Sequence, residues 1–181
     1  GLDALLFQIA EQAAPIVGAD RCSVFLHDAD AGELWSTVAT GLQGQIIRLP
    51  AQAGIAGACF SSGQVINLED AYGDPRFNPE PDTVTGYRTR SLLCLPMFNR
   101  EQEPLGVIQL LNKQAGPFTA EDVSFLRTYA NHAAVFLEMA QLQQSRIEAL
   151  EESREELRRL NQAKDKALDH LSHELRTPLA V

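Results

Sequence analysis

The chain has 181 residues, of which 45% are hydrophobic, and its formal net charge at neutral pH is −9. This length and apolar fraction are enough for one folded domain with an appendage, or for two small domains. The negative charge argues against a surface that binds nucleic acid or an acidic membrane, so we expect no nucleic-acid partner and no direct membrane contact.

Three cysteines, Cys22, Cys59 and Cys94, lie in apolar runs and form no CxxC pair. Cysteines in this pattern are typical of reduced, buried thiols in the cytosol. No stretch reaches the ~18–20 apolar residues that a membrane-spanning helix needs. We therefore predict a cytoplasmic location and no metal site. The chain begins and ends within helical patterns, so we expect it to be part of a longer protein. Whether membrane segments lie upstream of Gly1 is left open.

The first part of the chain alternates between helical and strand patterns. Apolar residues from Leu2 to Val17 recur at helical spacing, and Gly18 is placed to end that helix. An acidic turn at 28–32 predicts a hairpin between the first two of the expected strands. Short apolar or β-branched runs predict strands at 22–26, 34–39, 46–49 and 65–68. A run of small residues at 54–60 predicts a short helix.

Residues 69–90 are punctuated by proline and glycine and are predicted to form a long, structured loop. Loops of this length on a compact domain are usually functional. Two apolar strands follow at 91–98 and 105–111, joined by a polar turn at 99–103.

Thr119 is predicted to cap a helix that continues for about sixty residues, because neither proline nor glycine occurs between Thr119 and Thr177. Its apolar face narrows after Ala140 to a heptad seam with a polar residue, Asn161, at an a position, which favours a parallel dimer over a solvated single helix. The a and d positions are Ile147, Leu150, Arg154, Leu157, Asn161, Lys164, Leu168, Leu171 and Leu175.

The C-terminal run Ser-His-Glu-Leu-Arg-Thr-Pro-Leu at 172–179 carries the most chemistry in the chain. His173 falls at heptad position f, away from the seam, where an exposed imidazole can accept a phosphoryl group. Glu174 is adjacent and can orient the ring or take its proton. Thr177 follows one helical turn later, where its hydroxyl can position a water.

This run resembles the H-box of the dimerisation and phosphotransfer domain of sensor histidine kinases. The resemblance implies that His173 is phosphorylated from ATP and passes the group to an aspartate of a response regulator, with Glu174 as acid/base. Thr177 would help to remove phosphate from the regulator. Nothing in the 181 residues resembles the ATP- and Mg²⁺-binding kinase domain, so we expect the chain to be inactive alone and the longer parent to be an ATP-dependent protein-histidine kinase.

Residues 1–140 resemble a GAF domain, the small-molecule-binding module found in phosphodiesterases, cyclases, phytochromes and many kinases. The resemblance is greatest to the branch that binds cyclic nucleotides. It implies an α+β fold with a GAF-like antiparallel sheet flanked by helices, followed by the long coiled-coil helix. The matching stretches are 21–26, 54–57, 70–78, 85–90 and 106–113.

The resemblance also assigns a ligand pocket for cAMP or cGMP, with Ser23 at its floor and Gln109 where some relatives have glutamate. Ile55 and Ala56 would open a short helix whose backbone amides meet a phosphate. Thr40 and the preceding Ala39 stand where nucleotide binders often place an aspartate and an aromatic ring. Loop residues would close over the ligand: Asp82, Thr85 and Thr89. Lys113 and Asp122 match the family's structural lysine–aspartate bridge, although Val123 replaces the glutamate that usually follows.

We predict a GAF sensor domain at 1–140, a coiled-coil linker at 141–165 and the start of the phosphoacceptor helix at 166–181. The expected partners are a second copy in a parallel homodimer, a small-molecule ligand and a response regulator. Two alternatives stay open: a ligand-free GAF dimerisation module in the same kinase, and a GAF regulator of a cyclase or phosphodiesterase.

Overall fold

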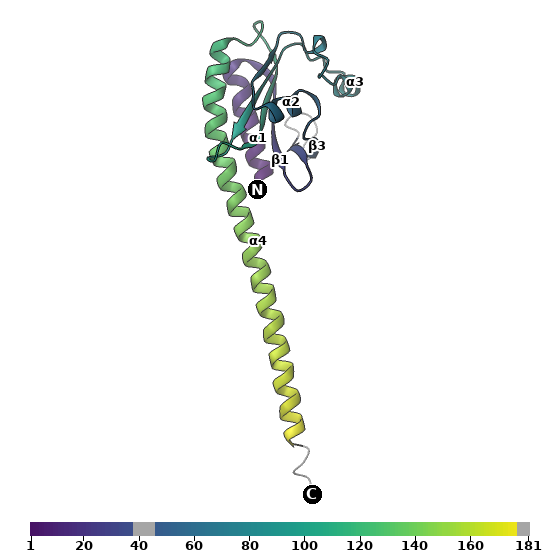
Figure 1. Ribbon diagram of the computed structural model, residues 1–181, viewed down its shortest axis with the longest axis vertical. Coiled ribbons are helices and arrows are strands. Elements are labelled where there is room, and N and C mark those ends of the chain that lie inside the picture. The colour runs from purple at the N-terminus through teal and green to yellow at the C-terminus, as the bar shows by residue number, and fades with distance from the viewer. Residues whose placement is uncertain (38–45, 177–181) are drawn as a thin grey trace. The chain divides into compact units, whose positions relative to one another are not determined.

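The computed structural model describes residues 1–37 and 46–176 (Figure 1). It divides into two compact units, Gly1–Ala140 and Gln141–Val181. The elements follow the chain in this order: α1 (Leu2–Val17), β1 (Ala19–Asp28), β2 (Glu33–Thr37), β3 (Ile46–Pro50), α2 (Gly54–Ser62), β4 (Ile66–Leu68), the 3₁₀ turn η1 (Ala71–Gly73), α3 (Glu80–Thr85), β5 (Leu92–Phe98), β6 (Pro104–Lys113) and α4 (Ala120–Arg176).

The first unit is built on a six-stranded antiparallel sheet with the strand order β3-β2-β1-β6-β5-β4. The two longest strands, β1 and β6, are neighbours at its centre, with Ser23 opposite Gln109. The predicted α+β class, with an antiparallel sheet and a long C-terminal helix, is confirmed.

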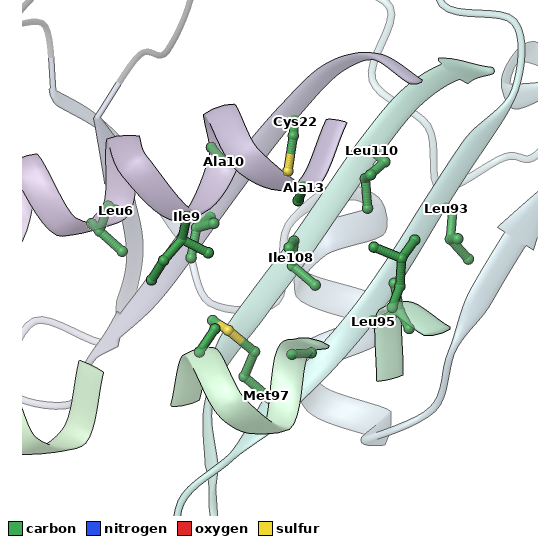
Figure 2. Close-up of a cluster of buried hydrophobic side chains, with 14 of the residues drawn as sticks. Leu6, Ile9, Ala10, Ala13, Cys22, Leu93, Leu95, Met97, Ile108 and Leu110 are labelled. Atoms are coloured by element: carbon green, nitrogen blue, oxygen red, sulfur yellow. The ribbon is translucent and has the colours of Figure 1, made fainter. Parts of the chain in front are cut away.

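One face of the sheet is covered by α1 and the first part of α4 (Figure 1). Alternate residues of a strand point to opposite faces, and those on this face form a core with the two helices. Figure 2 shows Leu6 and Ile9 of α1 and Ile108 of β6, which belong to this core. The opposite face carries a second cluster, in which Phe25 and Val107 pack with Ile55 and other residues of α2.

Several predicted boundaries hold, and one prediction is wrong. Thr119 caps α4 as expected: its Oγ1 accepts from the amide of Asp122 at 3.2 Å, and its own amide donates to the Asp122 carboxylate at 2.8 Å. The stretch 69–90 is not wholly irregular, because η1 and α3 form within it. Proline is tolerated in the first turn of a helix. Two of the three prolines that indicated a loop lie at the start of α3: Pro79 is its N-cap and Pro81 lies in its first turn.

The three cysteines are buried and free, as predicted. Among the residues that the structure describes, none of the helices combines the length and the apolar character needed to cross a bilayer.

Gly106 is required by the close approach of β6 to β1. A Cβ atom built on Gly106 would lie 2.0 Å from the carbonyl oxygen of Phe25, which is backbone and cannot move aside. We expect Gly106→Ala to lower the free energy of unfolding by about 1–3 kcal/mol, the usual cost of overpacking, as measured by urea denaturation. Gly32→Asn is the control, because Gly32 has open space around it and asparagine tolerates its positive φ. Equal stability of the two variants would contradict this role.

Candidate functional site

The face of the sheet that α2 covers brings together two of the predicted pocket residues. Ser23 of β1 pairs directly with Gln109 of β6, and both side chains are half-buried. By strand alternation they lie on the same face as Phe25 and Val107, which pack against α2. A hydroxyl and an amide on an otherwise apolar surface can fix the orientation of a small ligand.

Ile55 and Ala56 lie in the first turn of α2, as predicted, and both are buried in the core of this face. Their side chains therefore pack, and what they can offer a ligand is backbone. The first amides of a helix lack partners within the helix and attract anions. This part of α2 can meet a phosphate through its N–H groups only.

Asp82 and Thr89 are brought together by the loop, but their polar groups are already bonded to protein. The buried carboxylate of Asp82 accepts hydrogen bonds from the Thr89 amide at 2.7 Å, the Thr89 hydroxyl at 2.9 Å and the Tyr72 hydroxyl at 2.9 Å. The two residues thus form a clasp that holds the loop. Thr85 is exposed, and its hydroxyl donates to the Pro81 carbonyl within α3. Thr40 lies outside the described residues.

Two arginine–tyrosine stacks at this site were not predicted. The guanidinium of Arg21 lies 3.7 Å from the ring centroid of Tyr87, and that of Arg88 lies 3.7 Å from the centroid of Tyr72. Within residues 1–37 and 46–176, neither guanidinium forms an ion pair. Arg21 precedes Ser23 by two residues on β1, so the two side chains lie on the same face of the sheet. Strand alternation in the sequence could have predicted this position for Arg21.

Tyr87 joins the loop to the two central strands. Its hydroxyl donates to the Asp20 carboxylate at 2.8 Å and accepts from the side-chain amide of Asn112 at 2.9 Å. Burial and the nearby Asp20 carboxylate raise the pKa of Tyr87 to about 12, so the phenol stays protonated near neutral pH. The phenol is thus a fixed donor beside Arg21.

Asn112 and Lys113, at the end of β6, serve as scaffold. Asn112 has a positive φ of 55°, its side chain accepts from the Arg90 amide at 2.6 Å, and it donates to the Arg88 carbonyl at 2.8 Å. Lys113 forms the predicted ion pair with Asp122 in the first turn of α4. Burial would raise the pKa of Asp122, but the bonds from Lys113 and Thr119 hold it below the ordinary value.

Residues 1–137 match the family model described as the GAF domain. The chain belongs to the GAF domain family. Members of this family commonly bind small ligands and dimerise, and a regulatory or sensory role follows for this chain.

One curated relative is a much longer protein. Over 153 residues the chain is 34% identical to the probable 3′,5′-cyclic phosphodiesterase pde-5 of Caenorhabditis elegans, with 78% of this chain and 21% of that protein covered. The chain thus spans about a fifth of the length of this curated relative.

Two solved structures share the fold. The GAF domain of a phosphoenolpyruvate-protein phosphotransferase (ptsP) from Coxiella burnetii is 25% identical, with a TM-score of 0.69 over 80% of this chain and 87% of that one. The second GAF domain of DevS from Mycobacterium smegmatis is 22% identical, with a TM-score of 0.59 over 80% and 99%.

The predicted phosphoacceptor lies beyond the part of the chain that the GAF family model matches. His173 and Glu174 are exposed near the end of α4, and Thr177 lies outside the described residues. An oxygen of Glu174 lies 3.5 Å from Nε2 of His170, a partner that we did not predict. The i, i+4 spacing of His170 and Glu174 was a signal for this pair.

The hydrogen bonds of Asp82 predict that this residue stabilises the fold in the absence of a ligand. Asp82→Ala leaves the Thr89 amide and hydroxyl without their acceptor, so we expect the free energy of unfolding to fall by roughly 1–3 kcal/mol without any ligand. Thr85→Ala is the control, and its effect should stay within about 0.5 kcal/mol because its hydroxyl is exposed. Urea denaturation measures both. An Asp82→Ala variant as stable as the wild type would contradict the clasp.

Proposed function

We propose that this chain is the sensory and phosphoacceptor portion of a two-component sensor histidine kinase. The observation that carries the proposal is the contiguous run at 172–179, which resembles an H-box and follows a GAF domain in the sequence. Residues 172–176 of this run are the last residues of α4. His173 is exposed on that helix, which is what a phosphoryl acceptor requires.

In the proposed reaction, a nitrogen of the His173 imidazole attacks the γ-phosphorus of ATP, a P–N bond forms, and ADP leaves. The substrate would be ATP, bound as its Mg²⁺ complex by a kinase domain of the parent protein. Glu174 takes the proton of the attacking imidazole or orients the ring. The phosphoryl group then passes to an aspartate of a response regulator, and Thr177 assists its later hydrolysis.

The GAF domain would bind a cyclic nucleotide on the face of the sheet covered by α2. This ligand is favoured by the relative described as a probable 3′,5′-cyclic phosphodiesterase, which is 34% identical to the chain. Ser23 and Gln109 would contact the base, the first amides of α2 the phosphate, and Thr85 the outer rim. Arg21 adds a positive charge on the same face that suits an anionic ligand.

Ligand binding would reach the histidine through α4. Gln109 lies on β6, and β6 ends at Lys113, which is ion-paired to Asp122 in the first turn of α4. A ligand can bias the helix only if it binds one helix state better than another. The polar seam positions Arg154, Asn161 and Lys164 weaken the pairing of two copies, so a small bias would be enough to alter how His173 is presented.

A second candidate function is regulation of a cyclic phosphodiesterase or cyclase by the same GAF domain. The phosphodiesterase relative favours it. The two functions share the ligand and differ in the output, so they predict different domains after Val181.

Cyclic-nucleotide binding is testable on the 181-residue chain. We expect cAMP or cGMP to raise the melting temperature and to give a saturable calorimetric signal, with a stabilisation of about 2.7 kcal/mol at a hundredfold excess over Kd. Thr85→Ala should weaken binding by about two- to tenfold, the worth of one hydrogen bond.

Thr83→Ala is the matched control for the binding experiment. Thr83 is also an exposed threonine of α3 that bonds a carbonyl four residues back, but it was not assigned to the pocket. If neither nucleotide shifts the melting temperature, the cyclic-nucleotide proposal is lost and the ligand-free module becomes the better account.

The phosphoacceptor is tested in a protein that includes the sequence downstream of Val181. His173→Gln should abolish labelling from ATP that is radioactive at the γ-phosphate, and the wild-type label should be acid-labile, as a phosphoramidate is. His170→Gln is the matched control, since it removes a histidine three residues away and should keep the label. Full labelling of the His173→Gln protein, or a cyclase or phosphodiesterase domain downstream, would overturn the kinase assignment.

A further inference from the structure

The first part of α4 is tied to the β5–β6 hairpin by two ion pairs. Near the start of the helix, Asp122 pairs with Lys113 at the end of β6. Further along, an oxygen of Glu138 lies 3.8 Å from Nε of Arg100, in the turn between β5 and β6. The two acidic residues are about 24 Å apart along the helix, at a rise of about 1.5 Å per residue. The hairpin thus holds this stretch of α4 at two separate points.

The two attachments differ in how well they are shielded from water. The side chains of Lys113 and Asp122 are 16% and 13% exposed, and the Asp122 carboxylate also accepts from the Thr119 amide at 2.8 Å. The side chain of Arg100, by contrast, is 67% exposed. An ion pair with an exposed partner contributes little to stability and is screened by salt. The attachment of Arg100 to Glu138 is therefore the weaker of the two.

The Glu138 carboxylate has an acceptor oxygen that the fold leaves without a donor. This oxygen, Oε2, is buried and accepts no hydrogen bond from any residue that the structure describes. It is also the oxygen that pairs with Arg100, but 3.8 Å is beyond the usual hydrogen-bond distance of about 2.7–3.2 Å. A buried acceptor without a donor is costly, so a closer approach of the guanidinium would be favourable. The pair thus has room for a closed, hydrogen-bonded arrangement and for an open one.

The turn that carries Arg100 is held by its own hydrogen bonds. Oδ1 of Asn99 accepts from the amides of Glu101 and Glu103 at 3.0 and 2.8 Å. The Asn99 amide donates to the Glu103 carbonyl at 2.9 Å, which closes the hairpin. Because the backbone around Arg100 is fixed in this way, we expect a change at the ion pair to move the helix and not the turn.

On the helix side, Glu138 lies where the packing of α4 on the sheet ends. Leu137 is completely buried in the core, and no later residue of α4 that the structure describes is buried. The compact GAF unit ends at Ala140. Local opening occurs most readily where few buried contacts hold a segment. The turn of helix around Glu138 is thus the place where one additional contact can decide whether α4 stays on the domain.

We propose that Arg100 is a positioning residue of α4, and that its ion pair with Glu138 is the releasable one of the two attachments. Lys113 and Asp122 fix the start of the helix, whereas Arg100 and Glu138 set how firmly its last packed turn stays on the domain. Release frees this turn and leaves the core beneath the earlier turns intact.

The releasable attachment is a property of the fold and needs no ligand. Its use in signalling rests on the proposed function, in which Gln109 of β6 contacts the ligand and Arg100 lies in the turn of the same hairpin. A ligand that displaced the hairpin would then act on α4 at the turn where the helix leaves the GAF unit, in addition to its start at Asp122.

Amide hydrogen exchange of the 181-residue chain, read by mass spectrometry, tests the attachment. Arg100→Glu sets a carboxylate against Glu138, so the amides at 134–140 should exchange about three- to tenfold faster than in the wild type. The amides at 122–130 should keep the wild-type rate, because Lys113 still holds that end. Arg100→Lys keeps the charge and should stay within about twofold of the wild type at 134–140. Arg127→Glu is the matched control and should leave 134–140 unchanged, since Arg127 is an exposed arginine of α4 without an ion pair to any described residue.

Salt gives a second readout that a purely structural role of Arg100 would not move. Raising sodium chloride from about 0.05 M to about 1 M screens an exposed ion pair. Exchange at 134–140 should therefore become about threefold faster in the wild type. In Arg100→Gln, which has no charge to screen, the same change in salt should alter this rate by less than about twofold.

Four results would each overturn the proposal. An unchanged rate at 134–140 in Arg100→Glu, or a wild-type rate that salt does not alter, would mean that the ion pair does not hold the helix. Equal acceleration in Arg100→Lys would mean that the side chain acts through packing and not through its charge. Equal acceleration at 122–130 would mean that Arg100 stabilises the whole domain. None of these measurements involves a ligand or the phosphorylation of His173, so failure of the attachment and failure of the proposed function are distinguishable.

Discussion

The packing of α1 and the first part of α4 on one face of the sheet is the constraint on which the rest of the structure depends. It buries Leu6, Ala13, Leu126 and Leu137 almost completely and so fixes which side of α4 faces the domain. Because this face is filled by helices, the sheet can receive a ligand only on the other face, under α2 and the loop at 69–90. This packing thus places the candidate ligand site and the first part of α4 on opposite faces of the sheet.

On the ligand side, the loop at 69–90 is held by hydrogen bonds and stacking in addition to the apolar cluster under α2. Asp82 gathers Tyr72 and Thr89, while Asn112 ties the loop to β6 through the backbone of Arg88 and Arg90. A buried donor that loses its acceptor costs more than the bond itself contributes. The loop is therefore shaped before a ligand arrives. A ligand would meet a formed surface on which, within the described residues, Ser23, Gln109 and the first amides of α2 offer polar groups.

The sequence predicted features set by local spacing and missed those set by long-range contact. The strands, the Thr119 cap and the Lys113–Asp122 pair follow from period, capping chemistry and a short motif, and they are confirmed. The short α3 was missed because proline signals both a loop and the first turn of a helix. Asp82 and Thr89 were assigned to a ligand, but nothing in their spacing showed that the fold turns them toward each other. The stack of Arg21 on Tyr87 joins residues far apart in sequence, which periodicity cannot pair.

The same reasoning shows why α4 suits a signalling helix. Helix propensity alone does not stabilise an exposed helix of this length in water, and most helical stability comes from tertiary packing. The domain supplies that packing as far as Leu137, and beyond it Leu150, Leu157 and Leu168 are exposed. The parallel dimer of the proposed function would supply the packing that they lack. In the proposed dimer, α4 would be fixed by its own domain at one end and by contacts interrupted by polar residues at the other. A displacement would enter the helix at the end that the domain fixes. A shift of β6 would reach α4 through the ion pair of Lys113 with Asp122, at the point where the helix begins.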